Sequence, residues 1–227
     1  MIKIEGVSKT YHTGEFAVEA LKSVSLHIEK GAFLAIAGPS GSGKTTLLNC
    51  IGCIDTADEG SISIESDVVS GMDKPARTLF RRRNLGFIFQ TYNLIPVLTA
   101  YENVALALQM NLKDNDEIRH RTMDILKEVG LEGMEDRRPD RLSGGQEQRV
   151  AIARALVGNP KLILADEPTA NLDSHTGEDV LSIMRRMNER HNITFLFSTH
   201  DPMVMEFARR LVYLHDGEIV TDERRTV

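Results

Sequence analysis

The sequence predicts an α/β domain with an antiparallel β-layer at its N-terminus and a mostly helical block inserted between its later strands. Short apolar runs of buried-strand type alternate with helical segments along much of the chain. Between residues 91 and 158 that alternation stops, and three helical patterns follow one another. A length of 227 residues is enough for one core with such an insertion. We therefore expect a single domain over 1–227, in which 1–90 and 159–227 form the core and 91–158 a helical subdomain.

Each element has a local signal. Ile2–Tyr11 and Val18–Ile28 carry alternating apolar positions on either side of a turn with Gly14, which predicts the antiparallel layer. Apolar runs predict buried strands over 32–37, 85–90, 161–165, 193–198 and 211–214. Asp216-Gly217 predicts a hairpin turn into a strand over 218–221. Helical patterns cover 45–54, 98–110, 116–129 and 145–157.

The composition is that of an ordinary globular protein. Hydrophobic residues make up 41% and charged residues 26%, and 27 basic against 33 acidic side chains give a net charge of −6. This acidic balance removes the usual footprint of a DNA-wrapping protein, so no nucleic-acid partner is expected. No apolar run approaches the ~18 residues that span a bilayer, and early charges leave no signal-peptide core. A cytoplasmic protein is the expectation.

Cys50 and Cys53 are the two cysteines of the chain, which excludes a disulfide framework. Their C-x-x-C spacing could indicate a redox or zinc site. A zinc site would need further Cys or His ligands at matching spacing, and none follows closely. Because the pair lies in an apolar run of helical character, we interpret both as small buried hydrophobes.

The segment Gly38-Pro39-Ser40-Gly41-Ser42-Gly43-Lys44-Thr45 matches the eight-residue P-loop pattern in full. A predicted buried strand precedes it and a predicted helix follows, so backbone N–H groups and the helix dipole can converge on phosphate. Lys44 would reach the β- and γ-phosphates, and the Thr45 hydroxyl can ligate Mg²⁺. The alternative is a glycine-rich turn without a ligand, which the strand–loop–helix context disfavours.

A P-loop requires a second magnesium anchor, normally an acidic residue that ends an apolar strand. Asp166 ends the apolar run from Lys161 and fits this role, with water between it and the ion. Glu167 follows directly and is the natural general base for a water that attacks the γ-phosphate. The two carboxylates could instead only cap a strand end. Together with a complete P-loop, they predict an NTPase.

The run Leu142-Ser143-Gly144-Gly145-Gln146 directly precedes a predicted helix. A serine hydroxyl, two glycines and a helix N-terminus can form a second anion-binding site; alternatively, Ser143 is only a helix cap. In this run the sequence resembles the ATP-binding-cassette (ABC) ATPases. The resemblance implies a RecA-like P-loop NTPase core, and a head-to-tail homodimer that sandwiches two ATP between the P-loop of one subunit and the signature run of the other.

The other motifs of that family follow in order along the chain. Tyr11 lies where the family stacks an aromatic ring on adenine, and Gln90 matches the Q-loop, which touches Mg²⁺ and senses the permease. Asp173 matches the D-loop, which joins the two sites of the dimer, and His200 the switch histidine that contacts the γ-phosphate. Without the resemblance, these would be a packing tyrosine, a surface glutamine, a helix cap and a structural histidine.

The resemblance thus implies a complete set of site residues. The catalytic residues would be Lys44, Glu167 and His200, and Mg²⁺ would be held by Thr45, Gln90 and Asp166. The nucleotide-binding residues would be Tyr11, Gly38, Pro39, Ser40, Gly41, Ser42, Gly43, Lys44, Thr45, Thr46, Gln90, Ser143, Gly144, Gly145, Gln146 and Asp173.

Finer resemblance concerns the branch of the family. Residues 86–104 and 49–55 resemble the ATPases of lipoprotein release, macrolide export and cell division. This implies a separate membrane permease, a place on the cytoplasmic face of the membrane, and coupling through residues 90–101. Within 93–98 the apolar side chains could dock the permease or anchor the helical block. The alternatives are a soluble ABC ATPase that acts on nucleic acid or ribosomes, and a non-catalytic ATP clamp, against which Glu167 and His200 argue.

Overall fold

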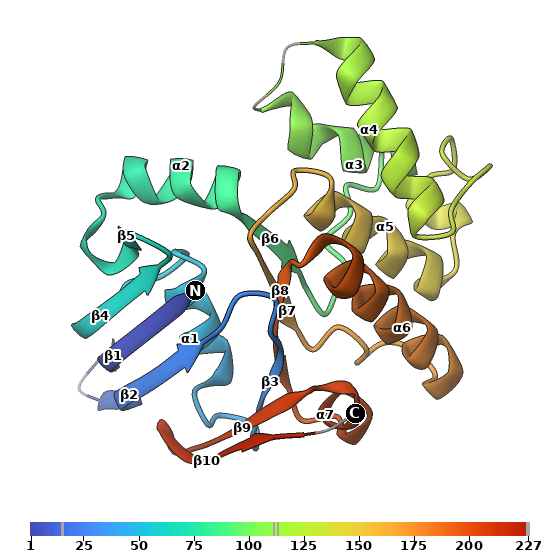
Figure 1. Ribbon diagram of the computed structural model, residues 1–227. Coiled ribbons are helices and arrows are strands. Elements are labelled where there is room, and N and C mark those ends of the chain that lie inside the picture. The colour runs from blue at the N-terminus through green and yellow to red at the C-terminus, as the bar shows by residue number, and fades with distance from the viewer. Residues whose placement is uncertain (15, 111, 113, 226–227) are drawn as a thin grey trace.

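The computed structural model describes residues 1–14, 16–110, 112 and 114–225, and its centre is a six-stranded sheet (Figure 1). Its strand order is β10-β9-β3-β8-β7-β6. The strands are β3 (Phe33–Ala37), β6 (Leu85–Ile88), β7 (Leu162–Asp166), β8 (Thr194–Thr199), β9 (Arg210–His215) and β10 (Glu218–Arg224). All neighbours pair in parallel except β10, which forms the predicted hairpin with β9. The predicted strand over 85–90 is two residues too long, because β6 ends at Ile88.

Period-two alternation sends the side chains of this sheet into two different cores. Phe33, Ala35 and Ala37 of β3 pack on the side that holds the helices, whereas Leu34 and Ile36 pack against α1 and the N-terminal sheet. Both sets are almost completely buried. A sheet covered on both faces explains why its strands read as continuous apolar runs rather than as alternating patterns.

The predicted antiparallel layer at the N-terminus is confirmed. It contains β1 (Ile2–Thr13), β2 (Phe16–Ile28), β4 (Glu59–Ile64) and β5 (Asp67–Val68), in the order β2-β1-β4-β5. β1 and β2 pair in antiparallel register from Ile2 opposite Ile28 to Tyr11 opposite Val18. The sequence did not predict β4 and β5, because their apolar alternation, Ile62 and Ile64, is too short to stand out.

The helices divide between the two faces. α1 (Lys44–Ile51) packs with the N-terminal sheet, and α2 (Lys74–Asn84), which was not predicted, leads into β6. The three predicted helices form what we call the helical group: α3 (Ala100–Gln109), α4 (Asn115–Glu128) and α5 (Gly144–Leu156). Figure 1 shows this group together with α6 (Ser174–His191) across the sheet from the β-layer, and α7 (Pro202–Phe207) beside β9.

The predicted helix over 45–54 is too long at its C-terminal end. α1 ends at Ile51, and Cys53 has a φ of 56°, in the left-handed region that stops a helix. Both cysteines are nevertheless buried free thiols, as the structural interpretation predicts. Among the residues that the structure describes, no helix is both long and apolar enough to cross a bilayer.

Candidate functional site

The parallel strands bring most of the predicted site residues together. β3, β8, β7 and β6 are consecutive neighbours in the sheet, so the segments that follow their carboxyl ends meet at one edge. A pocket of about 430 Å³ opens there. Its lining residues are Pro39, Ser40, Gly41, Gly43, Lys44, Thr45, Gln90, Asp166, Glu167 and His200. Apart from the glycine-rich loop and the start of α1, these residues come from the carboxyl ends of three strands: Gln90 follows β6, Asp166 and Glu167 end and follow β7, and His200 follows β8.

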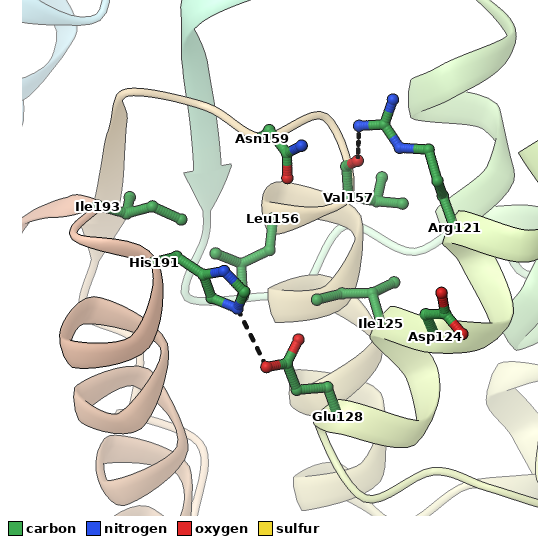
Figure 2. A pocket seen from close by; sticks show the side chains of 9 residues that line it. All are labelled: Arg121, Asp124, Ile125, Glu128, Leu156, Val157, Asn159, His191 and Ile193. Carbon is green, nitrogen blue, oxygen red and sulfur yellow. Dashed lines mark hydrogen bonds and ion pairs between the residues drawn. The ribbon is translucent and has the colours of Figure 1, made fainter. Parts of the chain in front are cut away.

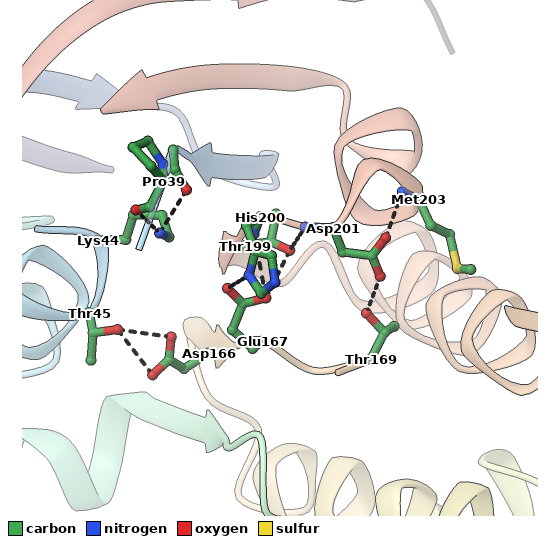
Figure 3. A network of polar contacts seen from close by, with 11 residues as sticks. Pro39, Lys44, Thr45, Asp166, Glu167, Thr169, Thr199, His200, Asp201 and Met203 are labelled. Atoms are coloured by element: carbon green, nitrogen blue, oxygen red, sulfur yellow. Dashed lines mark hydrogen bonds and ion pairs between the residues drawn. The ribbon is translucent and has the colours of Figure 1, made fainter. Parts of the chain in front are cut away.

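The P-loop starts α1 without a side-chain cap. Gly43 is the N-cap residue, and no side chain accepts a hydrogen bond from the first turn, so its N–H groups are left for another acceptor. Lys44 is buried, and its Nζ donates to the carbonyl oxygens of Gly38 and Pro39, each at 2.8 Å (Figure 3). Burial lowers the pKa of Lys44, against the opposing effect of Glu167 and Asp166.

Two glycines of the loop are required by close contacts. A Cβ on Gly43, whose φ is 100°, would lie 2.3 Å from the carbonyl oxygen of Ala20 in β2. A Cβ on Gly38 would lie 2.1 Å from the carbonyl oxygen of Leu214 in β9. The loop is thus clamped between β2 and β9. At Gly41, by contrast, a Cβ would meet nothing within 4 Å, so this part of the loop faces open space where a phosphate can approach.

Two of the three residues predicted to hold Mg²⁺, Thr45 and Asp166, lie side by side in the structure. The Thr45 Oγ1 lies 3.2 Å and 3.3 Å from the two carboxylate oxygens of Asp166. A hydroxyl and a carboxylate are the hard oxygen donors that Mg²⁺ prefers, and this ion commonly takes one or two protein ligands together with phosphate oxygens and water. The donor set therefore fits Mg²⁺ on chemical grounds.

Glu167 is held from several sides. Its backbone φ of 46° is unusual for a residue with a side chain, and its N–H donates to the carbonyl oxygen of Ser198 at 2.9 Å. Its carboxylate accepts from the Thr199 hydroxyl at 3.1 Å and lies 2.6 Å from His200 Nδ1. The Glu167 side chain is 14% exposed, whereas that of His200 is 70% exposed. A largely buried, hydrogen-bonded carboxylate beside an exposed imidazole suits a base that orients water.

Behind Glu167 lies a second set of polar contacts; Asp201-Pro202 was predicted to start a helix, whereas the contacts of Asp201 with Thr169 and Thr199 were not predicted. Thr169 donates to the Asp201 carboxylate at 2.8 Å, and the Asp201 N–H donates to the Thr199 hydroxyl at 2.9 Å (Figure 3). Asp201 also caps α7 by accepting from the N–H of Met203. The signal was present in the sequence, since an Asp before a proline at the end of an apolar strand is a helix start. These residues fix the turn that carries Glu167.

Tyr11 lies on the N-terminal sheet beside the start of α1. Its hydroxyl donates to the Asp55 carboxylate at 2.7 Å, and the Lys9 ammonium lies 5.3 Å from its ring centroid. Burial, together with the hydrogen bond to Asp55, raises the pKa of Tyr11. The ring is 38% exposed and lies opposite Val18 in the sheet register. An exposed aromatic face at this position can stack a base.

The signature run lies outside this pocket. Ser143 caps α5: its hydroxyl accepts from the N–H of Gln146 at 3.4 Å, and the Gln146 Oε1 accepts from the N–H of Ser143 at 3.0 Å. Asp173 likewise caps α6 and accepts from the N–H and hydroxyl of Thr176, which lowers the pKa of Asp173. Both residues therefore cap a helix, and neither lines the pocket.

A second pocket contains none of the predicted site residues. It lies between α4 and the ends of α5 and α6, and Figure 2 shows its lining. Glu128 of α4 accepts from Arg190 at 2.6 Å and contacts His191 Nε2 at 3.0 Å, both on α6. Arg121 of α4 donates to the carbonyl oxygen of Val157 at 2.7 Å. These contacts tie the helical group to α6.

Comparison with known proteins agrees with this site. A family model described as "ABC transporter" matches residues 21–170. The chain is 47% identical over 228 residues to the ABC transporter ATP-binding protein MJ0796 of Methanocaldococcus jannaschii, covering 99% of this chain and 97% of that protein. It is 44% identical to the ABC transporter ATP-binding protein YvrO of Bacillus subtilis, with 99% and 97% covered.

A third relative is longer than this chain. The macrolide export ATP-binding/permease protein MacB of Mannheimia succiniciproducens is 45% identical over 225 residues, which are 35% of its length. Among solved structures, dimeric MJ0796 in a post-hydrolysis state bound to ADP and Pi superposes with a TM-score of 0.91, at 45% identity over 100% of both chains.

The fold, the pocket and the similar proteins together define the class of this protein, which is a P-loop ATPase of the cassette type. The chain belongs to the ABC transporter family, as its ATP-binding and ATP-hydrolysing cassette.

Proposed function

We propose that two copies of this chain associate head to tail, hold two ATP between them, and drive a separate permease from the cytoplasmic face of a membrane. The observation that carries this proposal is the separation of two anion sites on one chain. The P-loop lies in the pocket, whereas Ser143 begins α5 outside it. A second chain, turned by a two-fold axis, can bring its signature run to the open side of the P-loop.

Each residue of the pocket then has a role. Lys44 would leave the carbonyl oxygens of Gly38 and Pro39 for the phosphates, and the N–H groups of the first turn of α1 would bind phosphate oxygens. Thr45 and Asp166, with Gln90 at the pocket wall, would hold Mg²⁺, which when bound neutralises phosphate charge.

Glu167 would accept the proton of the attacking water, and catalysis would come chiefly from positioning and electrostatics. In the structure its carboxylate contacts His200 Nδ1. Because the His200 side chain is 70% exposed, it can turn from Glu167 towards a γ-phosphate without disturbing the core. Tyr11 would stack the adenine.

The surface that receives the permease is the loop over 93–98, which leads into α3. Asn103, 1% exposed, holds this loop: its Nδ2 donates to the carbonyl oxygens of Ile95, Leu98 and Thr99, and its Oδ1 accepts from the N–H of Ile95. Ile95 is 38% and Val97 71% exposed, whereas Leu94 packs against the core. A rigid loop with outward apolar side chains is suited to docking.

The transport class is the finest part of the proposal. Residues 86–104 resemble the branch of lipoprotein release and macrolide export, and the MacB relative carries "macrolide export" in its name. We place this chain with exporters or lipoprotein-release systems of that branch, and assign residues 91–158 as the subdomain that carries the signature run to the partner.

The substitution Glu167→Gln tests the site and the dimer together. It keeps the size of the side chain but removes the base and one negative charge. Hydrolysis should fall by orders of magnitude while ATP still binds, and an ATP-dependent dimer should appear on size-exclusion chromatography and disappear with ADP. Adding Ser143→Arg should abolish that dimer, because the larger side chain occupies the place of the γ-phosphate.

The matched control is Ser182→Arg, which adds an arginine at a half-buried serine of α6 instead of at the signature run. It should leave the dimer of the Glu167→Gln protein intact. Wild-type hydrolysis by Glu167→Gln would remove Glu167 as the base. A variant that binds ATP yet stays monomeric at high concentration would overturn the head-to-tail dimer for the isolated subunit.

A further inference from the structure

The signature helix reaches the catalytic turn through one buried amide. Gln148 lies in the second turn of α5 and is 0% exposed. Its Nε2 donates to the carbonyl oxygen of Pro168 at 2.6 Å. Pro168 directly follows Glu167, so this hydrogen bond joins the helical group to the residue next to the proposed base.

The amide is not explained by packing. Its Oε1 is buried without a hydrogen-bond partner among the described residues. Burying an amide with an unsatisfied acceptor is unfavourable, and an apolar side chain of similar size would fill the same space without that penalty. The amide is therefore buried with half of its hydrogen-bonding capacity unused, and the hydrogen bond that it does make is the one to Pro168.

The turn that receives this contact depends on its surroundings. The φ of 46° at Glu167 is a sparsely populated conformation, which persists only where neighbouring contacts over-determine it. Ser198 and Thr199 of β8 hold Glu167, and Asp201 at the start of α7 holds Thr169. Those contacts come from the core, whereas Gln148 adds one from the helical group.

The same helix, α5, also contacts the start of the loop over 93–98, which we propose as the docking surface for the permease. Arg154, six residues after Gln148, donates to the carbonyl oxygens of Tyr92 at 2.7 Å and Asn93 at 2.5 Å. At 1.5 Å of rise per residue, the two side chains lie about 9 Å apart along one rigid helix. Hydrogen bonds from α5 thus reach the backbone of residues 92–93 at one point and that of Pro168 at another, so a displacement of the loop would be passed along α5 towards Pro168.

We propose that Gln148 is a positioning residue for hydrolysis. Its hydrogen bond to Pro168 couples the position of the turn that carries Glu167 to the position of α5, so the placement of the base depends on the helical group. This inference rests on the proposed role of Glu167. Gln148 does not contact nucleotide or the reacting atoms; it acts through Pro168.

The test substitution is Gln148→Met, which keeps an unbranched side chain of similar length and removes the donor. With saturating ATP, kcat should fall about 10- to 100-fold, because a small displacement of a catalytic group is enough for such a loss. The dissociation constant for ATP should stay within about threefold of wild type, because Gln148 lies outside the pocket.

The matched control is Thr122→Val in α4. Thr122 is also buried in the helical group, and its Oγ1 also lacks a partner among the described residues. This isosteric change should leave kcat within about twofold of wild type. If Gln148→Met does not fold, Gln148→Asn keeps the amide but shortens its reach, and the same fall in kcat is expected.

A double-mutant cycle separates positioning from general damage. In the Glu167→Gln background, Gln148→Met should not lower the residual hydrolysis rate further, and the ATP-dependent dimer should still form. If Gln148→Met slows hydrolysis equally in both backgrounds, or leaves kcat unchanged while Glu167→Gln is inactive, the positioning role is overturned and Glu167 stands. If Glu167→Gln hydrolyses ATP normally, the proposed base fails instead.

Discussion

Two helix starts in this molecule, those of α1 and α5, contain glycine and differ in how the N–H groups of their first turn are satisfied. α1 begins at Gly43 without a side-chain cap, so its first N–H groups await a ligand. α5 begins at Ser143 with a complete capping box, in which Ser143 and Gln146 satisfy each other's N–H groups. We call the start of α1 the open site, because its first N–H groups have no side-chain acceptor, and the start of α5 the closed site, because its capping box supplies one.

This difference between α1 and α5 suggests different roles, in nucleotide binding by one chain and in association of two chains. A single chain can bind nucleotide at α1, because the N–H groups there have no competitor. At α5, in the dimer that we propose, a phosphate presented by the other chain would have to displace or share the hydrogen bonds of the capping box. The long 3.4 Å contact between Gln146 N–H and Ser143 Oγ is the one most readily exchanged for a phosphate oxygen.

The largest expected effect comes from Lys44→Ala at the open site. The variant loses a buried ammonium and its charge-assisted hydrogen bonds to phosphate, worth about 1.5–3 kcal/mol each. ATP affinity should therefore fall by at least about 10- to 100-fold, and hydrolysis should fall with it. Nucleotide titration measures the loss, and circular dichroism should show an intact fold.

One consequence for the fold is local. Without Lys44 Nζ, the carbonyl oxygens of Gly38 and Pro39 lose their donor, so the loop can relax while the sheet stays formed. A folded Lys44→Ala protein that binds ATP with wild-type affinity would contradict the assignment of the open site.

The far end of α1 gives a second, pH-dependent effect. Burial raises the pKa of Cys50 to about 12 and of Cys53 to about 11, from a reference of 9.0. Both thiols are protonated in the folded chain at pH values where the unfolded chain ionises. The contribution that the two protonated thiols make to the free energy of unfolding is fully present below about pH 9. It is lost as the pH rises from there towards the pKa values of the thiols in the folded chain.

Replacing both cysteines with alanine should flatten this dependence. Between pH 9 and 11 the wild-type free energy of unfolding should fall faster than that of the double variant, by up to about 1.4 kcal/mol per pH unit for each thiol. Denaturant titrations at a series of pH values measure the two slopes. Equal slopes would mean that the thiols ionise in the folded chain, against their burial.

A third prediction concerns the loop that follows Gln90. Val97→Ser should reduce permease-stimulated hydrolysis several-fold and leave basal hydrolysis and thermal stability unchanged, because Val97 is 71% exposed. Leu94→Ser is the control, since Leu94 packs against the core and should lower stability and both activities. Reconstituted complexes and the isolated subunit provide the two measurements. Loss of basal activity in Val97→Ser would assign this residue to packing.

The sequence predicted the part of the site that is local along the chain. The P-loop, Asp166 and Glu167 each stand at the end of an apolar strand, and parallel neighbours then bring them to one edge. Contacts between residues far apart in the sequence could not be predicted. Nothing local shows that Gln148 is buried against Pro168, or that Leu94 turns inward while Val97 turns outward. In the sequence, Gln148 stands between Glu147 and Arg149, so no local feature marks it as buried.

Three elements that were not predicted have weak patterns in the sequence. β4, β5 and α2 lie between Glu59 and Asn84, where short alternation and a charged helix give weak periodicity. The single buried apolar residue of α2 is Phe80, so most of this helix faces solvent and shows no apolar stripe. None of these elements lines the pocket, which is why the site could be predicted without them.

The smallest effect should come from Ser143→Ala at the closed site, and it tests the contrast between the two helix starts most directly. The variant removes the acceptor for the N–H of Gln146 and with it an N-cap worth about 1 kcal/mol. The melting temperature should fall by about 2–4 °C, while the ATP affinity of the monomer stays unchanged because Ser143 lies outside the pocket. Thermal melting with and without ATP, and nucleotide titration at low protein concentration, give both numbers. If the monomer loses ATP affinity, Ser143 acts on the nucleotide within its own chain, and the closed site needs no second copy.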